Sequence, residues 1–238
     1  MNGRQGSDMI GVETVEAGLR DLSLQGTGKS GGGRFRRVTM EGISTINGNL
    51  VCEQFKLDGV GRVNGGIQAN FFEVHGVFRS QSGIKAHKVE AEGKLSVHGM
   101  FRSETFAING LLKLTGDCVG ERFAMYGGFS MEGMLNADTV ELDMQTRCAA
   151  KEIGGSIIRV RAAHGGWKRL IGWVVPALRT ELVAETIEGD ELTLEHVRAQ
   201  VVRGRDVAIG AGCRIDRVEY TNTLTVHETA IVKERKQA

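Results

Sequence analysis

Apolar and small residues recur in pairs along most of this chain, and the pairs repeat with a period of 17 residues. Between Val38 and Thr139 the period runs without a slip through six units, and the apolar pairs occupy positions 1 and 3, 7 and 9, and 13 and 15 of each unit. A spacing of two places both members of a pair on the same face of a strand. Each unit is therefore predicted to contain three short strands. In the second unit the pairs are Phe55 and Leu57, Gly61 and Val63, and Ile67 and Ala69.

Glycine marks the corners between these predicted strands. The fifth position of every unit is glycine, and so is the eleventh position in five of the six units, with Ser82 as the exception. Glycine is favoured where the backbone turns through positive φ, because other residues clash there. The glycines expected at the first corner are Gly42, Gly59, Gly76, Gly93, Gly110 and Gly127.

A unit this short cannot bury its apolar face alone, so successive units must stack on one another. Side chains one period apart are then expected to form columns with a spacing of about 4.8 Å, and Phe55, Phe72 and Phe106 should share one column. Helices are unfavourable here, because each interior glycine costs a helix about 1 kcal/mol. The predicted fold is all-β: a single-stranded parallel β-helix, or β-solenoid, with 17-residue turns.

The repeat extends beyond the six regular units. Leu22, Leu24 and Gly26 match the first, third and fifth positions of a preceding turn that is one residue short, and the period of 17 returns between Val207 and Leu224. We therefore expect one body of about nine turns and about 40 Å. The predicted parts are a flexible leader, a main array, an insert that is a loop or a short amphipathic helix, final turns and a solvated charged tail. Their ranges are 1–21, 22–162, 163–183, 184–232 and 233–238.

Composition narrows the possible classes of protein. A net charge of +1 gives no reason to expect nucleic acid as a partner. No stretch reaches the roughly 18 apolar residues of a membrane span, and no signal-peptide pattern is seen, so a cytoplasmic location is expected. The cysteines occupy inward positions and no pair has C-x-x-C spacing, which predicts buried, unpaired thiols. They are Cys52, Cys118, Cys148 and Cys213.

Two features that could bind cofactors have simpler interpretations. The segment GTGKSGGG, residues 26–33, resembles a phosphate-binding loop, but that motif needs glycine where Ser23 stands and a helix directly afterwards. A glycine-rich corner is preferred. His75, His87 and His98 fall in three different columns, so they do not converge on a metal. We therefore predict no cofactor and no metal.

Charged residues collect in two further columns. Acidic residues gather at position 16, as clustered carboxylates do in sugar-cleaving β-helices, but no long loop covers them and a solvated face is preferred. Basic residues gather at position 8, either for solubility or as a stripe that pairs with an acidic stripe on another filament or with anionic partners. The acidic set is Glu53, Glu104, Glu121 and Asp138, and the basic set is Arg62, Arg79, Lys113 and Arg147.

The insert holds both tryptophans of the chain. Trp167 and Trp173 flank an apolar run and are accompanied by Lys168 and Arg169. That composition fits packing against the side of the solenoid, and it also fits contact with a membrane interface or a partner. Trp167, Arg169 and Trp173 are the candidate contact residues.

The two ends of the predicted solenoid are the candidate assembly sites. Each end exposes an unpaired strand edge, which templates another chain unless it is capped, and neither the leader nor the tail resembles a cap. End-to-end stacking would bury apolar positions of the terminal turns. Whether like or unlike ends meet is left open at this point. The candidate residues are Leu22, Leu24, Leu224, Val226, Ala230 and Val232.

The F-x-I-x-G repeats, the lead-in GTGKSGGGRF and the late block Ile187–Tyr220 resemble the bactofilins, polymer-forming cytoskeletal proteins of bacteria. The similarity covers roughly residues 22–232 and is to the longer type, with an insert before the last turns. It implies a right-handed β-helix of triangular cross-section that forms nonpolar filaments without nucleotide. It also implies a scaffold for envelope, shape or motility structures, with other bactofilins and envelope or motility proteins as partners, often beside the inner face of the membrane.

Non-enzymatic self-assembly is therefore the preferred function, and two alternatives differ from it in class. One is a β-helix enzyme, because VAIGAGCRI, residues 207–215, looks like one hexapeptide stretch of an acyltransferase, and the acidic column suggests sugar chemistry. The spacing of the main array departs from strict sixes, and no catalytic histidine is identifiable. The other is an adaptor that binds proteins along its flank without polymerising.

Overall fold

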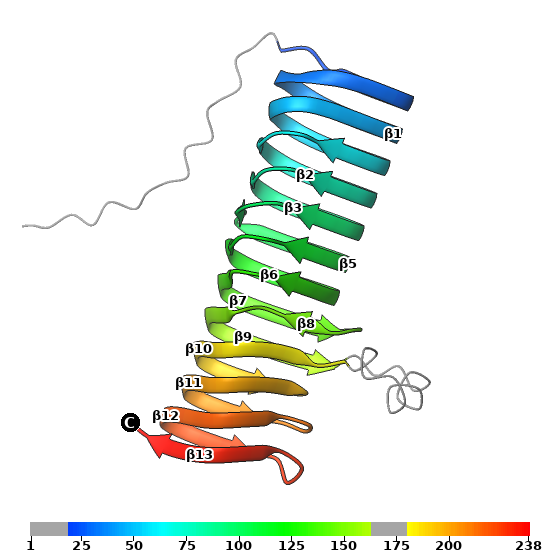
Figure 1. Cartoon of the computed structure of the whole chain (residues 1–238). Coiled ribbons are helices and arrows are strands. Elements are labelled where there is room, and N and C mark those ends of the chain that lie inside the picture. The colour runs from blue at the N-terminus through cyan, green and yellow to red at the C-terminus, as the bar shows by residue number, and fades with distance from the viewer. Residues whose placement is uncertain (1–18, 163–179) are drawn as a thin grey trace, which may run out of the picture.

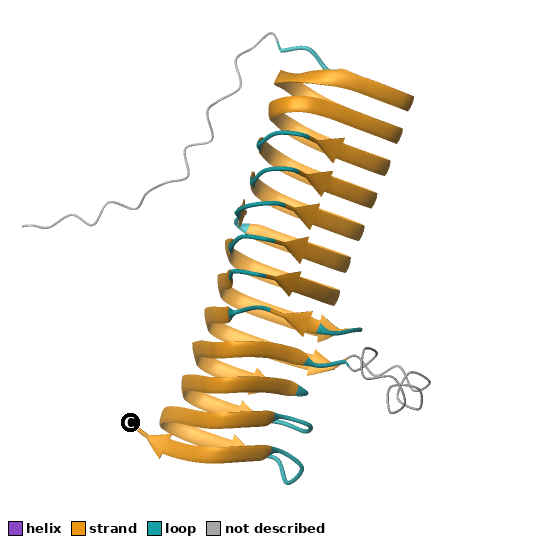
Figure 2. Ribbon diagram, viewed as in Figure 1, coloured by secondary structure: helices purple, strands orange, loops and turns teal. Residues whose placement is uncertain are grey.

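The structure is a computed structural model, and it describes residues 19–162 and 180–238. The described chain is wound into a β-solenoid of about 10 turns, in which the strands of successive turns pair in parallel (Figure 1). These residues form strands and connecting loops without any helix (Figure 2). The strands are β1 Leu22–Val63, β2 Ile67–Ser80, β3 Ile84–Val97, β4 Phe101–Arg102, β5 Thr105–Leu114, β6 Cys118–Met131, β7 Met134–Met144, β8 Cys148–Ala149, β9 Glu152–Ala162, β10 Leu182–Leu194, β11 Val197–Ile209, β12 Arg214–Val226 and β13 Ile231–Gln237.

The register of the ladders confirms the predicted columns. Phe55 on β1 pairs with Phe72 on β2, and the same column continues through β3 to Phe106 on β5 and Phe123 on β6. The rings of Phe55 and Phe72 stack face to face, with centroids 4.8 Å apart and planes 9° apart. The predicted fold class is therefore confirmed. The spacing between strands also suits aromatic residues at this position, because it lies within the range of centroid distances at which rings attract each other.

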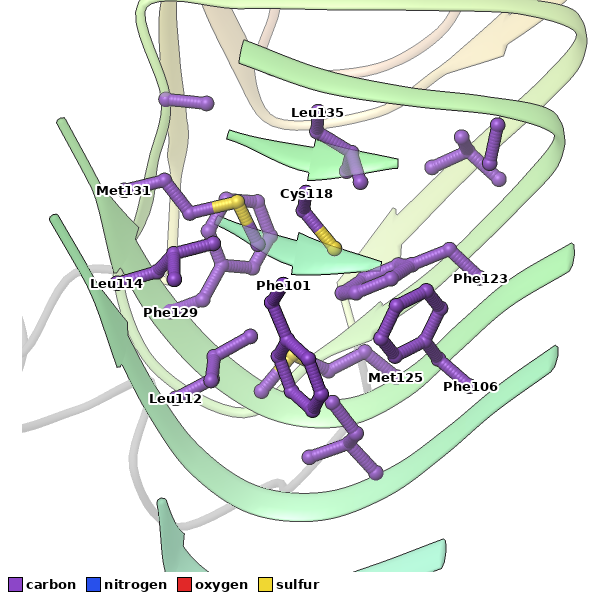
Figure 3. Close-up of a cluster of buried hydrophobic side chains, with 14 of the residues drawn as sticks. Phe101, Phe106, Leu112, Leu114, Cys118, Phe123, Met125, Phe129, Met131 and Leu135 are labelled. Atoms are coloured by element: carbon purple, nitrogen blue, oxygen red, sulfur yellow. The ribbon is translucent and has the colours of Figure 1, made fainter. Parts of the chain in front are cut away.

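The interior is a continuous apolar core that runs the length of the solenoid. Figure 3 shows a part of it that spans successive turns, where Phe101, Phe106, Phe123 and Phe129 lie around Cys118. The rings of Phe101 and Phe106 meet edge to face at 4.9 Å. Burial of each such side chain contributes about 1.5–3 kcal/mol to the stability of the solenoid. All four cysteines lie in this core as free thiols, as predicted.

The corner glycines have the backbone conformation that their repetition indicates. Gly42, Gly59 and Gly76 have φ of +90°, +129° and +123°, and Gly93, Gly110 and Gly127 follow with +113°, +137° and +143°. The predicted break between strands at this corner is wrong. Because Gly59 pairs directly with Gly76, the ladder continues around the corner, and interruptions fall mainly at the second corner, as at residues 64–66 and 81–83.

Two boundaries and one column member predicted from the repeat need correction. Leu182 and Val183 belong to β10, so they are part of the final turns rather than of the insert. Residues 233–237 are not a free tail, because they lie in β13 and pair with β12. Arg147 does not continue the basic column, since Ala149 is the residue that pairs with Ser130. A corner two residues longer than usual, around Thr146, causes this last shift. Of the predicted leader, residues 1–21, the part from 1 to 18 lies outside the described residues.

Candidate assembly surfaces

The apolar side chains of the first turn are covered by the core on one side only. Leu22 and Leu24 on β1 are partly buried against the core, whereas Val38 and Met40 of the following turn are fully buried. Gly26 stacks on Gly42, so this turn is one residue short, as predicted. Its outer edge is an unpaired parallel strand among the described residues, and it lies at one end of the molecule in Figure 1.

The glycine-rich segment forms the next part of this first turn. Residues 26–33 lie within β1, which runs on to Val63, so no helix follows and the phosphate-binding interpretation is excluded by geometry. No heavy atom lies within 4 Å of the position that a Cβ would take on Gly26 or Gly31. This stretch therefore presents backbone with very few side chains, which is the kind of edge that accepts another strand.

The last turn mirrors this arrangement with larger side chains. Leu224 and Val226 on β12 pair with the buried Val207 and Ile209 of β11, yet they are themselves only partly buried. Ala230 and Val232 are also partly buried, and Val232 pairs with the buried Ile215. All six residues predicted for assembly therefore lie in the two terminal turns, where the structure leaves one side of each column uncovered.

Arg235 is a residue of this end that sequence analysis missed. It pairs with Val218, which is fully buried, so it occupies the last place in an otherwise apolar column, and it is exposed. A charge at an inward position discourages stacking of a further strand. The end is thus apolar on two walls and charged on the third. The signal was present in the sequence, since Arg235 follows Val218 by one period.

The predicted basic and acidic columns lie on the outer faces of the solenoid, away from its two ends. Arg62 pairs in register with Arg79, and Lys113 follows two turns later in the same column, after Ser96. Within residues 19–162 and 180–238, none of these three cations makes an ion pair. In the acidic column, Glu104 contacts Nδ1 of His87 at 2.8 Å.

His75 and His87 form surface ion pairs with carboxylates. His75 Nε2 lies 2.8 Å from Glu73 and Nδ1 lies 3.5 Å from Glu92. The hydrogen bond to Glu73 raises the pKa of His75, because the carboxylate stabilises the protonated imidazole. Across the described residues, no group of three potential ligands is arranged to hold a metal.

The buried cysteines have thiols of low reactivity. Desolvation raises the pKa of Cys52 and Cys148 to about 12 and that of Cys213 to about 11, and it also raises the pKa of Cys118. Neutral thiols are poor nucleophiles and poor metal ligands. The core cysteines therefore act as small apolar side chains.

The candidate contact residues of the insert, Trp167, Arg169 and Trp173, lie outside the described residues. The segments that the structure does describe include no helix with the length and apolarity needed to cross a bilayer.

Comparison with known proteins finds two relatives in Bacillus subtilis (strain 168). The chain is 34% identical to the uncharacterized protein YhbF over 104 residues, which are 43% of this chain and 41% of that protein. It is 36% identical to the uncharacterized protein YhbE over 104 residues, 43% of this chain and 42% of that protein. The match thus spans less than half the length of these relatives. No family model matches the chain. No solved structure matches it.

Proposed function

We propose that this protein is a non-enzymatic scaffold that assembles end to end, without nucleotide, into filaments like those of the bactofilins. The observation that carries the proposal is the pair of open ends: within residues 19–162 and 180–238, each terminal turn has an unpaired strand edge and apolar side chains that are covered on one side only. Such edges add another chain unless something blocks them, and stacking would complete both the backbone ladder and the apolar columns.

Two kinds of junction would achieve this. If unlike ends meet, Leu224 and Val226 of one molecule continue the columns of Leu22 and Leu24 in the next, and the parallel ladder is unbroken. If like ends meet, the strands at each junction run antiparallel and the filament is nonpolar, as the resemblance to bactofilins implies. Both junctions bury the same apolar side chains, so they are distinguished by which variants still pair.

The test uses one charged variant at each end. Val226→Glu places a carboxylate in the C-terminal junction and Leu24→Glu places one in the N-terminal junction, where an unpaired buried charge is strongly unfavourable. We expect each variant alone to lose filaments in negative-stain microscopy. If unlike ends meet, mixing the variants yields heterodimers from two monomers. If like ends meet, each variant alone is already a dimer through its intact end.

The control is Met100→Glu, which adds the same charge at a flank residue that is 46% exposed. This variant should polymerise like the original protein, and circular dichroism should show the same β signal for all variants. Unimpaired filaments in Val226→Glu and in a matching Val232→Glu would contradict the C-terminal junction. Monodisperse monomers of the unaltered chain would contradict assembly itself and support the adaptor alternative.

The cellular setting follows from the same proposal. A nucleotide-independent filament would serve as a fixed platform in the cytoplasm for envelope, shape or motility proteins, and other bactofilins could join it. The insert, with Trp167, Arg169 and Trp173, is the proposed point of contact with the inner face of the membrane or with a partner.

A further inference from the structure

A column of apolar side chains stands on the outside of the solenoid. It occupies the sixth position of the repeat, directly after the corner glycine, and we name it the apolar ridge. Its members account for four of the seven large hydrophobic residues that are exposed in the described chain. The apolar ridge consists of Ile43, Val60, Val77 and Leu111, which are 61%, 46%, 44% and 48% exposed.

Register makes this column continuous. Val60 pairs with Val77, which pairs with Lys94, which pairs with Leu111. Five consecutive turns therefore contribute to one strip about 19 Å long. Lys94 lies in the strip between Val77 and Leu111, and its four-carbon stem can lie along these apolar side chains while the ammonium stays in water. Single exposed apolar residues need no explanation, but an aligned strip marks a contact surface.

Opposite charges border the apolar ridge on its two sides. Two positions before it, at the fourth position of the repeat, stand Glu41, Asp58 and Glu92. Two positions after it stand the bases Arg62, Arg79 and Lys113, which make no ion pair within the described residues. The strip is thus acidic, apolar and basic in order across its width, and among the described residues no carboxylate lies within ion-pair distance of the basic column.

This order determines how two copies can face each other. When two molecules meet ridge to ridge with their long axes parallel, the two-fold axis lies along the solenoid and the acidic border of each faces the basic border of the other. When their axes are antiparallel, acid faces acid and base faces base, which is repulsive. We propose that a second copy of this chain binds the apolar ridge in the parallel orientation.

The contact is lateral, so it is distinct from the end-to-end junctions. A strip of this size lies below the roughly 1,000 Å² that a stable interface usually buries, and two isolated molecules should pair weakly. In a filament, as proposed above, many ridges would act together and the weak contacts would be strengthened by multivalency. Lateral pairing can therefore be measured in molecules whose ends are blocked.

Disulfide trapping tests both the contact and its orientation. The native thiols are buried, so a cysteine introduced on the surface is the reactive one. Ile43→Cys and Leu111→Cys are made in the Val226→Glu, Leu24→Glu background and oxidised, separately and as a mixture. A disulfide needs Cα atoms within about 7 Å, whereas these two positions lie about 19 Å apart along the ridge. The parallel arrangement predicts that each variant crosslinks to itself, with no excess of mixed dimers.

Two controls complete the experiment. Met100→Cys, at a flank position whose exposure is close to that of Leu111, measures random collision. Val60→Glu combined with Val77→Glu adds charge to the apolar ridge without touching the core, and it should lower the yield of self-crosslinked dimers about tenfold. The proposal is overturned if the ridge cysteines crosslink no more than Met100→Cys, or if the glutamates have no effect. Preferential mixed dimers of Ile43→Cys with Leu111→Cys would instead establish the antiparallel arrangement and refute the parallel one.

None of these outcomes depends on filament formation. If the ridge cysteines crosslink but the unaltered chain forms no filaments, the lateral contact stands and the proposed function fails. If filaments form but the ridge cysteines do not crosslink, the proposed function stands and this inference fails.

Discussion

A single steric requirement repeats along the first corner of the solenoid. At Gly110, φ is +137° and a Cβ would collide with the backbone carbonyl oxygen of Gly93 in the turn below. Neither partner can move away, because both are held in the ladder on either side. The glycine is thus required both by its own backbone conformation and by the close approach of its neighbour.

Replacing Gly110 by alanine should therefore destabilise the protein by more than about 2 kcal/mol, since strained backbone alone costs 1–3 kcal/mol. The matched control is Gly31→Ala, where nothing lies near the new methyl group and a small gain of stability is expected. Urea denaturation followed by circular dichroism measures both. Equal midpoints for the two variants would show that the corner tolerates a side chain.

At the scale of residues, the sequence predicts a structural position correctly where every unit of the repeat needs the same type of residue there. The glycines and the cysteines were placed correctly because each occupies a position that the period defines. Arg147 was misplaced because the corner around Thr146 is longer, and the period alone carries no information about a local insertion. Arg235 was missed because a charged chain end resembles a solvated tail, although its spacing from Val218 indicated a strand.

At the scale of elements, neighbouring turns stabilise each other mainly through the stacked core columns. Phe72 is fully buried, stacks on Phe55 and meets Phe78 edge to face at 5.3 Å. Removing its ring leaves a cavity that spans adjacent turns, and the rigid ladders around it limit collapse.

Phe72→Ala should cost about 3–5 kcal/mol, the usual range for a buried phenylalanine. Phe71→Ala removes the same side chain from the adjacent outward position, where the ring is only half-buried and lies near Lys88, and it should cost less than about 1 kcal/mol. Because unfolding of stacked repeats can be local, hydrogen exchange of β1 to β3 is the informative measurement. Similar exchange rates in both variants would contradict the role of the column.

The sequence predicts which side chains of each wall point inward, but it does not predict that the strands continue around the first corner. Alternation along Phe55 and Leu57 shows which side chains point inward, and this part of the prediction is confirmed. The same alternation gives no information about backbone hydrogen bonds at the corner. The continuation of the β1–β2 ladder through Gly59 and Gly76 therefore could not be inferred. The apolar ridge could have been read from the sequence, since its members share one position of the repeat.

At the scale of the whole molecule, a solenoid is a one-dimensional stack whose ends differ from its middle only in lacking a neighbour. The proposed end-to-end assembly should therefore depend on how closely each terminal turn resembles an internal one. The C-terminal turn differs from an internal turn at Arg235. This residue pairs with the buried Val218, at a position that an apolar residue occupies in the preceding turns.

Arg235→Val should consequently promote end-to-end assembly, because it removes a charge that would be desolvated in the junction and completes the apolar column. We expect the protein concentration at which filaments first sediment to fall about tenfold, the equivalent of about 1.4 kcal/mol per junction. Lys236→Val is the matched control, since Lys236 is the next residue on the same strand and pairs with Glu219 on the outer face. If both variants lower that concentration equally, general loss of positive charge explains the effect. If Arg235→Val leaves it unchanged, the C-terminal turn is not part of a junction.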